Sequence, residues 1–405
     1  MLDAMVTSAP VQRRQRKSLG AFYSPQALVE PMVSWAVHRA GQDVLDPSCG
    51  DGVFLEHAAH RLRHLGATAE GVGALLHAVD LNPEAVRVTR SRLSSALGRP
   101  FENVRQESFF ALTPPGVLLG PPEGVDVVIG NPPYIRYQEF AGDARLEALE
   151  RVTGAGVQLS RLASSWAHFV VHALEFLRPG GRLALILPAE LIHTTYAAPL
   201  RRHLRRCFAE VHVISFRQAV FPDVQAEVVL LLAAGKVGGP GRLRLAEVET
   251  GEELADLEAV LAGAEAFAPA EEPEKWIPGY TVNPGAATLE HLQERALLVP
   301  LGEVGKANIG FVSGANDYFV VTPEEAVRWR LPESSLRSAL VRARQIPGLQ
   351  ITADDMSQVR SQGDRCLLWL PGERLSRAEQ AYVRRGEELG YAERYKCRVR
   401  SPWYR

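Results

Sequence analysis

The chain has 405 residues, of which 46% are hydrophobic and 23% are charged, and its formal net charge is -2. These values are typical of a folded, soluble protein and exclude a disordered or collagen-like chain, while the length predicts two or three domains. No apolar stretch reaches the roughly 20 residues of a membrane-spanning helix, and the N-terminus lacks the apolar segment of a signal peptide. We therefore expect a cytoplasmic protein with no membrane partner.

Up to about residue 234, short apolar runs that suit buried strands alternate with helical patterns. The first predicted helix starts near Ser24, a candidate N-cap that Pro25 follows at the first helical position. Further helices are predicted at 54–65, 82–97 and 165–177, and strands at 43–46, 75–80, 125–130, 182–188, 211–216 and 226–234. This alternation predicts an α/β fold with a mixed, mainly parallel sheet that helices cover on both faces.

The composition changes near residue 235. The sequence GKVGGPG at 235–241 is typical of a turn or hinge, and the stretch that follows is acidic and rich in alanine. We place a linker at 235–241, between a catalytic domain over 18–234 and a second domain over 242–405, and we regard the basic segment 1–17 as flexible. The second half contains no internal repeat, and its pattern alone does not assign a fold.

The first chemical motif is DPSCGDG at 46–52, directly after a predicted strand. Ligands of open α/β sheets bind beyond the carboxyl ends of the strands, where glycines let the backbone come close, and Gly50 and Gly52 suit this role. Asp80 ends the next strand, at a position where a carboxylate commonly accepts hydrogen bonds from ribose hydroxyls. The loop lacks the spacing and the lysine of a phosphate-binding loop, so we do not expect a nucleoside triphosphate.

The second chemical motif is NPPY at 131–134, also directly after a predicted strand. An aromatic amino group is a poor nucleophile because its lone pair is delocalised into the ring. The side-chain oxygen of Asn131 and the carbonyl of Pro132 can both accept hydrogen bonds from such a group and localise its lone pair. Pro132 and Pro133 hold the backbone rigid, and Tyr134 offers a flat face for a base that has been extruded from a duplex.

The cysteines and histidines give no sign of a metal site. The four cysteines stand singly, so neither a zinc site nor a disulfide framework is indicated. His60 with His64 and His168 with His172 have helical spacing, but neither pair encloses the glutamate of a zinc motif. We interpret both pairs as packing or surface residues and predict no metal.

The order strand, DPSCGDG, helix, strand, DLNP, helix, strand, NPPY resembles S-adenosylmethionine-dependent methyltransferases that act on exocyclic or amide nitrogens. Four further stretches resemble the N6-adenine DNA methyltransferases of restriction-modification systems, of the TaqI-like type with the gamma order of motifs. They are GAFYSPQALVEPMV at 20–33, AVFPDVQAEVVLLL at 219–232, and the pair SGANDYF and YKCRVRSPWYR at 313–319 and 395–405.

The resemblance implies a Rossmann-like catalytic domain, a C-terminal α+β target-recognition domain, S-adenosylmethionine as cofactor and double-stranded DNA as partner. It assigns catalysis to Asn131, Pro132, Pro133 and Tyr134, and stacking of the flipped adenine to Tyr134 and Phe221. It assigns cofactor contacts to Ser24, Asp46, Pro47, Gly50, Gly52, Asp80, Leu81, Ser108, Phe109 and Asn131.

Two features depart from the family pattern. Ser108 stands in the register of an aspartate that usually contacts the adenine of the cofactor. Relatives usually continue past the SPWY element, so we expect a recognition domain that is short or incomplete at Arg405. Oligomerisation is not required for this reaction, and we expect a monomer.

Several alternatives stay open. NPPY alone also fits an RNA or protein-glutamine N-methyltransferase, and the fold fits a catalytically silent DNA-specificity subunit. We find no nuclease constellation, so a cognate restriction endonuclease would be a separate protein. Some side chains also have two interpretations. Trp166 and Phe169 are core or site residues, and the resemblance aligns Phe169 with a position that stacks on the cofactor. Tyr196 and the basic stretch 201–206 lie on the surface or contact phosphate, and Tyr318, Phe319 and Trp403 are core residues or base contacts.

Overall fold

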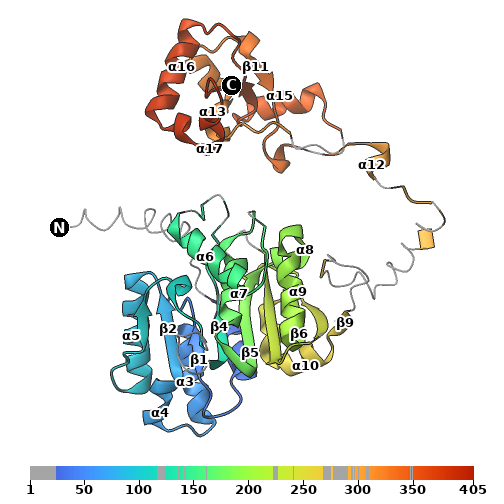
Figure 1. Cartoon of the computed structure of the whole chain (residues 1–405). Helices are drawn as coiled ribbons and strands as arrows, with labels where there is room; N and C mark the ends of the chain where they lie inside the picture. The colour runs from blue at the N-terminus through green and yellow to red at the C-terminus, as the bar shows by residue number, and fades with distance from the viewer. Residues whose placement is uncertain are drawn as a thin grey trace. The chain divides into compact units, whose positions relative to one another are not determined.

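The computed structural model of the chain divides into two compact units, Met1–Arg295 and Ala296–Arg405 (Figure 1). The residues that the structure describes are 24–115, 124–135, 137, 139–140, 142–160, 162–221, 227–239, 241–267, 275–276, 291–292, 295, 297–299, 301–306, 310–346, 348 and 350–405.

The first unit is built around a sheet that has nine strands within the described residues, in the order β3-β2-β1-β4-β5-β7-β6-β8-β9. Neighbouring strands from β3 to β5 are parallel, whereas β7 is antiparallel to both β5 and β6. The prediction of a mixed, mainly parallel sheet is confirmed. The bounds are β1 Val44–Asp46, β2 Leu76–Asp80, β3 Val104–Gln106, β4 Val125–Gly130, β5 Leu177–Pro188, β6 Phe208–Phe216, β7 Val228–Lys236, β8 Arg242–Val248 and β9 Glu265–Phe267.

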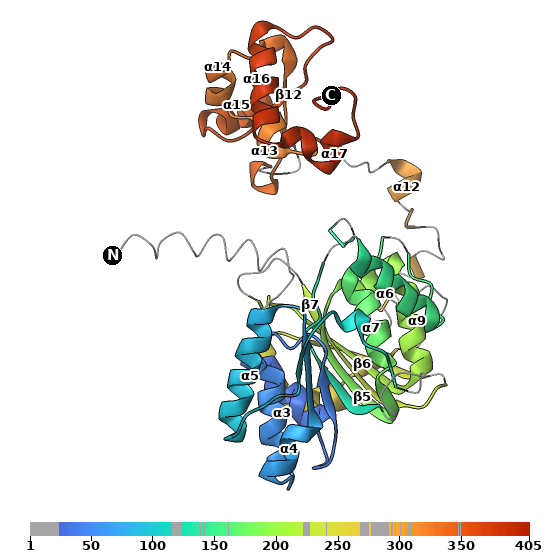
Figure 2. The same cartoon turned by 60° about the vertical axis from the view of Figure 1, so that its left-hand side comes forward.

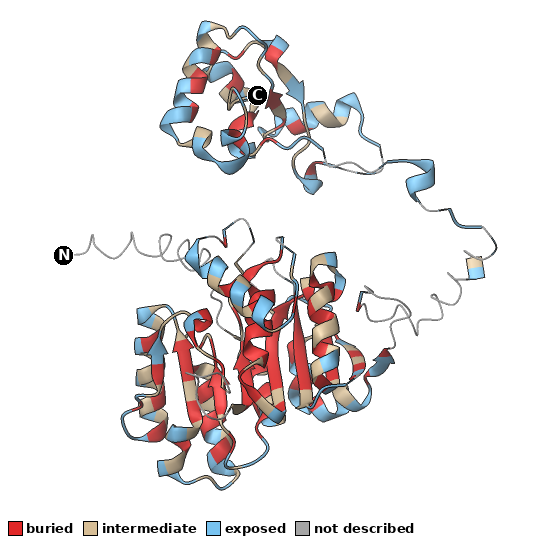
Figure 3. Ribbon diagram, viewed as in Figure 1, coloured by how far each residue is buried: buried red, intermediate tan, exposed pale blue. Residues whose placement is uncertain are grey.

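Helices cover both faces of this sheet, as its continuous apolar strands require. Alternate residues of β5 belong to two separate cores: Leu183 and Leu185 pack with α6, α7 and α9, and Ala184 and Ile186 with α2, α3 and α5. Figure 2 shows α3, α4 and α5 together on one side, and Figure 3 shows the buried strands between the layers. The bounds are α2 Gln26–Ala36, α3 Val53–His64, α4 Ala69–Leu75, α5 Pro83–Leu97, α6 Asp143–Gly154, α7 Ser165–Leu174, α8 Glu190–His193, α9 Ala198–Cys207 and α10 Leu257–Ala262, with 3-10 turns at Phe109–Ala111, Thr195–Ala197 and Gly251–Asp256.

The predicted linker at 235–241 lies inside the first unit. These residues complete β7 and connect it to β8, which pairs in parallel with β6 along its whole length. Gly235, Gly238 and Gly239 adopt the positive φ values of 70°, 75° and 125° that tight connections use. The division between the two units falls at 295/296, later in the chain than the expected linker.

The second unit is an α+β fold around a small antiparallel sheet in the order β10-β12-β11. Its core is aromatic: the Tyr318 ring stacks on Tyr382 with centroids 4.7 Å apart, and the hydroxyl of Tyr382 donates to the Tyr318 carbonyl at 2.7 Å. Tyr318 and Phe319 are therefore core residues, and Trp403 packs against them. The bounds are α12 Leu301–Val304, α13 Asn316–Phe319, β10 Val320–Val321, α14 Pro323–Arg328, β11 Leu336–Ser338, α15 Ala353–Ser361, β12 Leu367–Trp369, α16 Arg377–Glu388 and α17 Tyr395–Arg398, with 3-10 turns at Glu333–Ser335, Ala343–Gln345 and Tyr391–Glu393.

Membrane-spanning helices, metal sites and disulfides are all lacking among the described residues. No helix there has both the length and the apolar character to cross a bilayer. No group of three or more His, Cys, Asp or Glu side chains in that part of the chain could hold a metal ion. The four cysteines are free thiols.

The two histidine pairs lie where packing or surface residues would. His60 and His64 are exposed on α3, and His168 and His172 are buried on α7. His172 lies among aromatic rings, and its Nε2 is 3.1 Å from the Phe109 carbonyl, to which the neutral ring donates. Burial lowers the pKa of His172 from 6.5 to about 4.

We expect His172 to make the fold less stable in acid. Because its pKa is lowered in the folded state, the unfolded chain binds an extra proton between pH 6.5 and about 4. Its contribution to stability is thus full above pH 6.5 and is lost on acidification, by up to roughly 3 kcal/mol. The check is denaturant unfolding at several pH values for the wild type and His172→Gln, which keeps a donor but does not titrate.

The variant should show a shallower loss of stability with falling pH than the wild type. His64→Gln, an exposed change on α3, is the matched control and should leave the pH dependence as it is. Equal pH slopes for His172→Gln and the wild type would contradict the assignment.

Candidate active site

The motifs predicted from the sequence meet at the carboxyl edge of the sheet. β1 lies between β2 and β4, and both neighbours run parallel to it. The loop 46–52 follows β1, residues 80–82 follow β2, and residues 131–134 follow β4. The strand order reverses between β1 and β4, and this switch point is where open α/β sheets bind their ligands.

The glycine loop is tied to the end of β2 through Asp80. One Asp80 oxygen accepts a hydrogen bond from the Gly50 N–H at 2.9 Å, and the other accepts one from the Asn82 N–H at 2.8 Å. Gly50 and Gly52 have φ values of 54° and 80°, which residues with a side chain rarely adopt. A Cβ on Gly52 would lie 3.0 Å from the Thr89 hydroxyl of α5, so glycine also permits close helix packing there.

Asp46 is an acidic residue at the end of β1. Its side chain is buried, with 1% of the residue exposed, and one oxygen accepts a hydrogen bond from the Ser48 N–H at 3.1 Å. Burial raises the pKa of Asp46 well above its ordinary value, and the negative charges of Asp80 and Asp51 raise it further. A positively charged group bound beside these acids would relieve that repulsion.

Asn131 links three parts of the site. Its side-chain oxygen accepts a hydrogen bond from the Tyr134 hydroxyl at 2.6 Å, and its side-chain nitrogen lies 3.4 Å from the Ser24 hydroxyl. Its backbone carbonyl accepts a hydrogen bond from the Ser48 hydroxyl at 3.3 Å. The N-terminal segment, the glycine loop and the NPPY loop thus converge on one residue.

The expectation that Ser24 caps the first helix is wrong. The helix begins at Gln26, Pro25 occupies the N-cap position, and no side chain caps it. The Ser24 hydroxyl turns instead toward Asn131. A serine before a proline suits a local cap, but a contact with a residue 107 positions away prevails here.

Tyr134 is half-buried, and its hydroxyl group is anchored. Besides the Asn131 oxygen, the hydroxyl reaches the Ile186 carbonyl of β5 at 3.0 Å. Burial raises the pKa of Tyr134, which keeps the hydroxyl protonated as a donor. Its ring packs against the same core cluster that contains Phe221, which is only 6% exposed. The two residues assigned to base stacking therefore share one cluster, while 222–226 lie outside the described residues.

The remaining residues assigned to the cofactor differ in exposure. Leu81 directly follows Asp80 and is 66% exposed. Pro47 is buried and Ser108 is half-buried. Phe109 is buried, and its ring lies tilted against the Phe169 ring with the centroids 4.8 Å apart, so both rings belong to the core.

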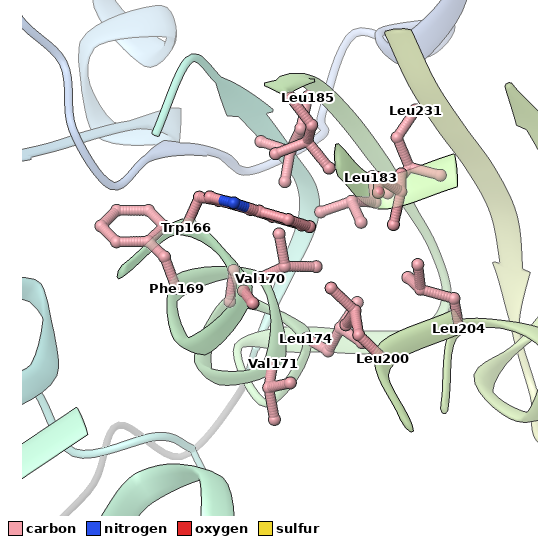
Figure 4. Close-up of a cluster of buried hydrophobic side chains, with 14 of the residues drawn as sticks. Trp166, Phe169, Val170, Val171, Leu174, Leu183, Leu185, Leu200, Leu204 and Leu231 are labelled. Carbon is pink, nitrogen blue, oxygen red and sulfur yellow. The ribbon is translucent and has the colours of Figure 1, made fainter. Parts of the chain in front are cut away.

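Trp166 and Phe169 on α7 lie in the hydrophobic cluster of Figure 4, as the core interpretation expects. The Trp166 ring nitrogen donates to the Tyr196 hydroxyl at 3.1 Å, and that hydroxyl donates to Glu190 of α8. Arg201, the first residue of the basic stretch, is 2% exposed and donates to two backbone carbonyls near α8. Tyr196 and Arg201 therefore have structural partners.

Sequence reasoning missed two residues beside the NPPY loop. Gly130 ends β4, and a Cβ there would lie 2.7 Å from the Asp46 carboxylate. Ser165, the first residue of α7, bonds to the backbone of Pro133 and Ile135. A glycine directly before NPPY was a visible signal, whereas nothing in the local pattern marks Ser165.

The strand order, the glycine loop at the switch point and the NPPY loop together define a methyltransferase fold of the α/β class. The model of the N-6 DNA Methylase family matches residues 11–237. The chain belongs to the N-6 DNA methylase family, a family of adenine-specific DNA methyltransferases, and the resemblance seen in the motifs is confirmed. Residues 273–405 match the C-terminal domain of the Type II methyltransferase M.Eco57I.

Similar proteins come from restriction-modification systems. The Type II methyltransferase M.AccI of Acinetobacter calcoaceticus is 20% identical over 98% of this chain and 70% of its own length. M.XamI of Xanthomonas campestris pv. amaranthicola is 26% identical over 78% of this chain and 56% of its own length. The solved structure of the ATP-dependent Type ISP restriction-modification enzyme LlaBIII bound to DNA has a TM-score of 0.58 at 15% identity, over 77% of this chain and 26% of that one, and shows the fold alone.

Proposed function

We propose that the protein transfers a methyl group from S-adenosylmethionine to N6 of an adenine flipped out of duplex DNA. The observation that carries the proposal is the Asn131 amide, held between Tyr134 and Ser24 at the end of β4 and next to the glycine loop. We infer that Asn131 and the adjoining backbone form a fixed acceptor pair for the amino group of a base. We further propose a cytoplasmic monomer that modifies DNA alongside a separate restriction endonuclease.

The acids at the carboxyl edge of the sheet fit this cofactor. Asp46 would accept hydrogen bonds from the ammonium group of the cofactor, since the carboxylate is buried beside other acids. Asp80 accepts two backbone N–H groups but has lone pairs left for ribose hydroxyls. Leu81 and Ser108 would contact the adenine. When bound, the cofactor supplies an electrophilic methyl group on sulfur.

The NPPY loop would prepare the nucleophile. The Asn131 oxygen accepts one bond from Tyr134 and retains a second lone pair for an amino hydrogen of adenine. The Pro132 carbonyl would take the other hydrogen, so that the lone pair of N6 is localised and directed toward the methyl group. Because these acceptors are fixed before the substrate binds, catalysis rests on positioning and electrostatics.

The charge of the two units supports DNA as the partner. Residues 296–405 carry 17 Lys and Arg against 13 Asp and Glu, whereas residues 1–295 carry 28 against 34. A basic recognition unit favours contact with phosphates, while an acidic catalytic unit explains the nearly neutral total.

The test is transfer of labelled methyl groups from S-adenosylmethionine to duplex DNA, RNA and a protein with exposed glutamines, followed by nucleoside analysis. N6-methyladenine in DNA would establish the reaction. Label in RNA or protein would assign the NPPY loop to another amino-group substrate. Cofactor binding without transfer to any acceptor would indicate a silent specificity subunit.

Phe221→Leu is expected to weaken binding or slow turnover on duplex DNA by about 1–3 kcal/mol, the value of one stacked base. Leucine removes the flat ring but retains most of the packing volume, which matters because Phe221 is 6% exposed. The measurement is kcat/KM together with the fluorescence of 2-aminopurine at the target position.

Phe101→Leu is the matched control, because Phe101 is 2% exposed in the same core cluster but precedes β3. Its kinetics per folded molecule should equal those of the wild type. Unchanged kinetics and base fluorescence for Phe221→Leu would remove Phe221 from the base pocket.

A further inference from the structure

Ser165 connects α7 to the backbone on both sides of Tyr134. Its hydroxyl donates to the Pro133 carbonyl at 2.6 Å and accepts a hydrogen bond from the Ile135 N–H at 2.9 Å. Its own backbone N–H donates to the Ile135 carbonyl, also at 2.9 Å. These three bonds bracket one residue of the proposed catalytic loop.

The start of α7 and the NPPY loop each have backbone groups that need a hydrogen-bond partner from outside their own segment. Ser165 is the first residue of α7, so its N–H has no acceptor within the helix, and the Ser164 side chain does not cap that end. The loop contributes the carbonyl of Pro133 and the N–H and carbonyl of Ile135. Neither proline of the loop has an N–H to offer. Ser165 is 1% exposed, so these bonds form away from water, where an unmade bond is costly.

Ser165 influences the orientation of the Asn131 amide through Tyr134. The Tyr134 backbone is fixed by the bonds of its neighbours to Ser165, and its hydroxyl is fixed at the Ile186 carbonyl and the Asn131 oxygen. A shift of the Tyr134 backbone would move that hydroxyl, and the Asn131 amide would then no longer be held in one orientation. Effects of this kind on reacting geometry can cost about 100-fold in rate.

We propose that Ser165 is a positioning residue for methyl transfer, which sets the NPPY loop and through Tyr134 the orientation of Asn131. This inference rests on the proposed function. Ser165 itself does not touch the substrate.

The experiment compares Ser165→Ala and Ser165→Cys with the wild type. Alanine removes both side-chain bonds, and cysteine keeps nearly the same volume but is a weak hydrogen-bonding group. We expect kcat to fall roughly 10- to 100-fold in both variants, while KM for DNA and the Kd for S-adenosylmethionine change by less than about twofold. Hydrogen exchange should also become faster in a peptide that contains the Ile135 amide.

Val170→Ala is the matched control for loss of stability, because Val170 lies fully buried further along the same helix (Figure 4). Its kcat per folded molecule should equal that of the wild type. A wild-type kcat for Ser165→Cys would overturn the inference, as would an increase in KM alone. If the wild type itself transfers no methyl group, the proposed function fails, while the exchange of Ile135 still reports whether Ser165 holds the loop.

Discussion

Replacement of Asn131 by alanine is expected to lower the rate of methyl transfer roughly 100- to 1000-fold, the usual cost of losing one preorganised polar group at a reacting centre. The Asn131 oxygen is the acceptor that the Tyr134 hydroxyl fixes at 2.6 Å, and alanine leaves the base amino group without that partner. We expect the contact of Asn131 with the cofactor to contribute less to binding than the contacts of Asp46 and Asp80. The Kd for S-adenosylmethionine should therefore change by less than about threefold. Single-turnover transfer and cofactor titration measure the two quantities separately.

Asn103→Ala is the matched control for this substitution. Asn103 is also half-buried and hydrogen-bonded, with its amide 2.6 Å from the Leu76 carbonyl, but it precedes β3 at the opposite edge of the sheet. The control should lose stability without losing transfer per folded molecule. Wild-type transfer by Asn131→Ala would exclude the side chain from catalysis, and lost cofactor binding would make it a cofactor ligand instead.

The strands that the sequence predicted are those buried on both faces. Continuous apolar runs occur at 127–129 in β4, 183–187 in β5 and 228–234 in β7, because helices cover both sides of the sheet, and such runs stand out in a single sequence. β3 has only three residues and one buried side chain, so it gives no pattern. β8 alternates apolar and polar residues, but it follows a glycine-rich connection that is also typical of a domain boundary. Local composition cannot distinguish a turn within a sheet from a linker between domains.

The sequence predicted the site residues that stand at strand ends. It did not predict the contacts between residues that are far apart in the chain. Asp46, Asp80 and Asn131 each follow a recognisable strand, and parallel strands bring their carboxyl ends together. Ser24 and Ser165 act through partners 107 and about 30 positions away, which no local pattern reveals. A serine at a helix start has an adequate local explanation, and only the fold shows that its hydroxyl is used elsewhere.

Gly130→Ala is expected to disturb the site through Asp46. Gly130 is the last residue of β4, with a φ of 155°, and an added Cβ would lie 2.7 Å from one oxygen of the buried Asp46 carboxylate. Either the carboxylate or the strand end must move. We expect a loss of stability of about 1–3 kcal/mol and weaker binding of S-adenosylmethionine, measured by denaturant unfolding and by cofactor titration.

The double variant Gly130→Ala with Asp46→Ala separates the two sources of this cost. Removal of the carboxylate relieves the contact but leaves the unfavourable φ, so Gly130→Ala should be less destabilising in the Asp46→Ala background than in the wild type. Gly154→Ala is the matched control, since a Cβ at the end of α6 meets no atom within 4 Å. Additive effects on stability in the double variant would show that backbone conformation alone requires glycine at 130. A loss of stability in the double variant that is smaller than the sum of the two single losses would show that β4 ends in glycine because the Asp46 carboxylate occupies the space beside it.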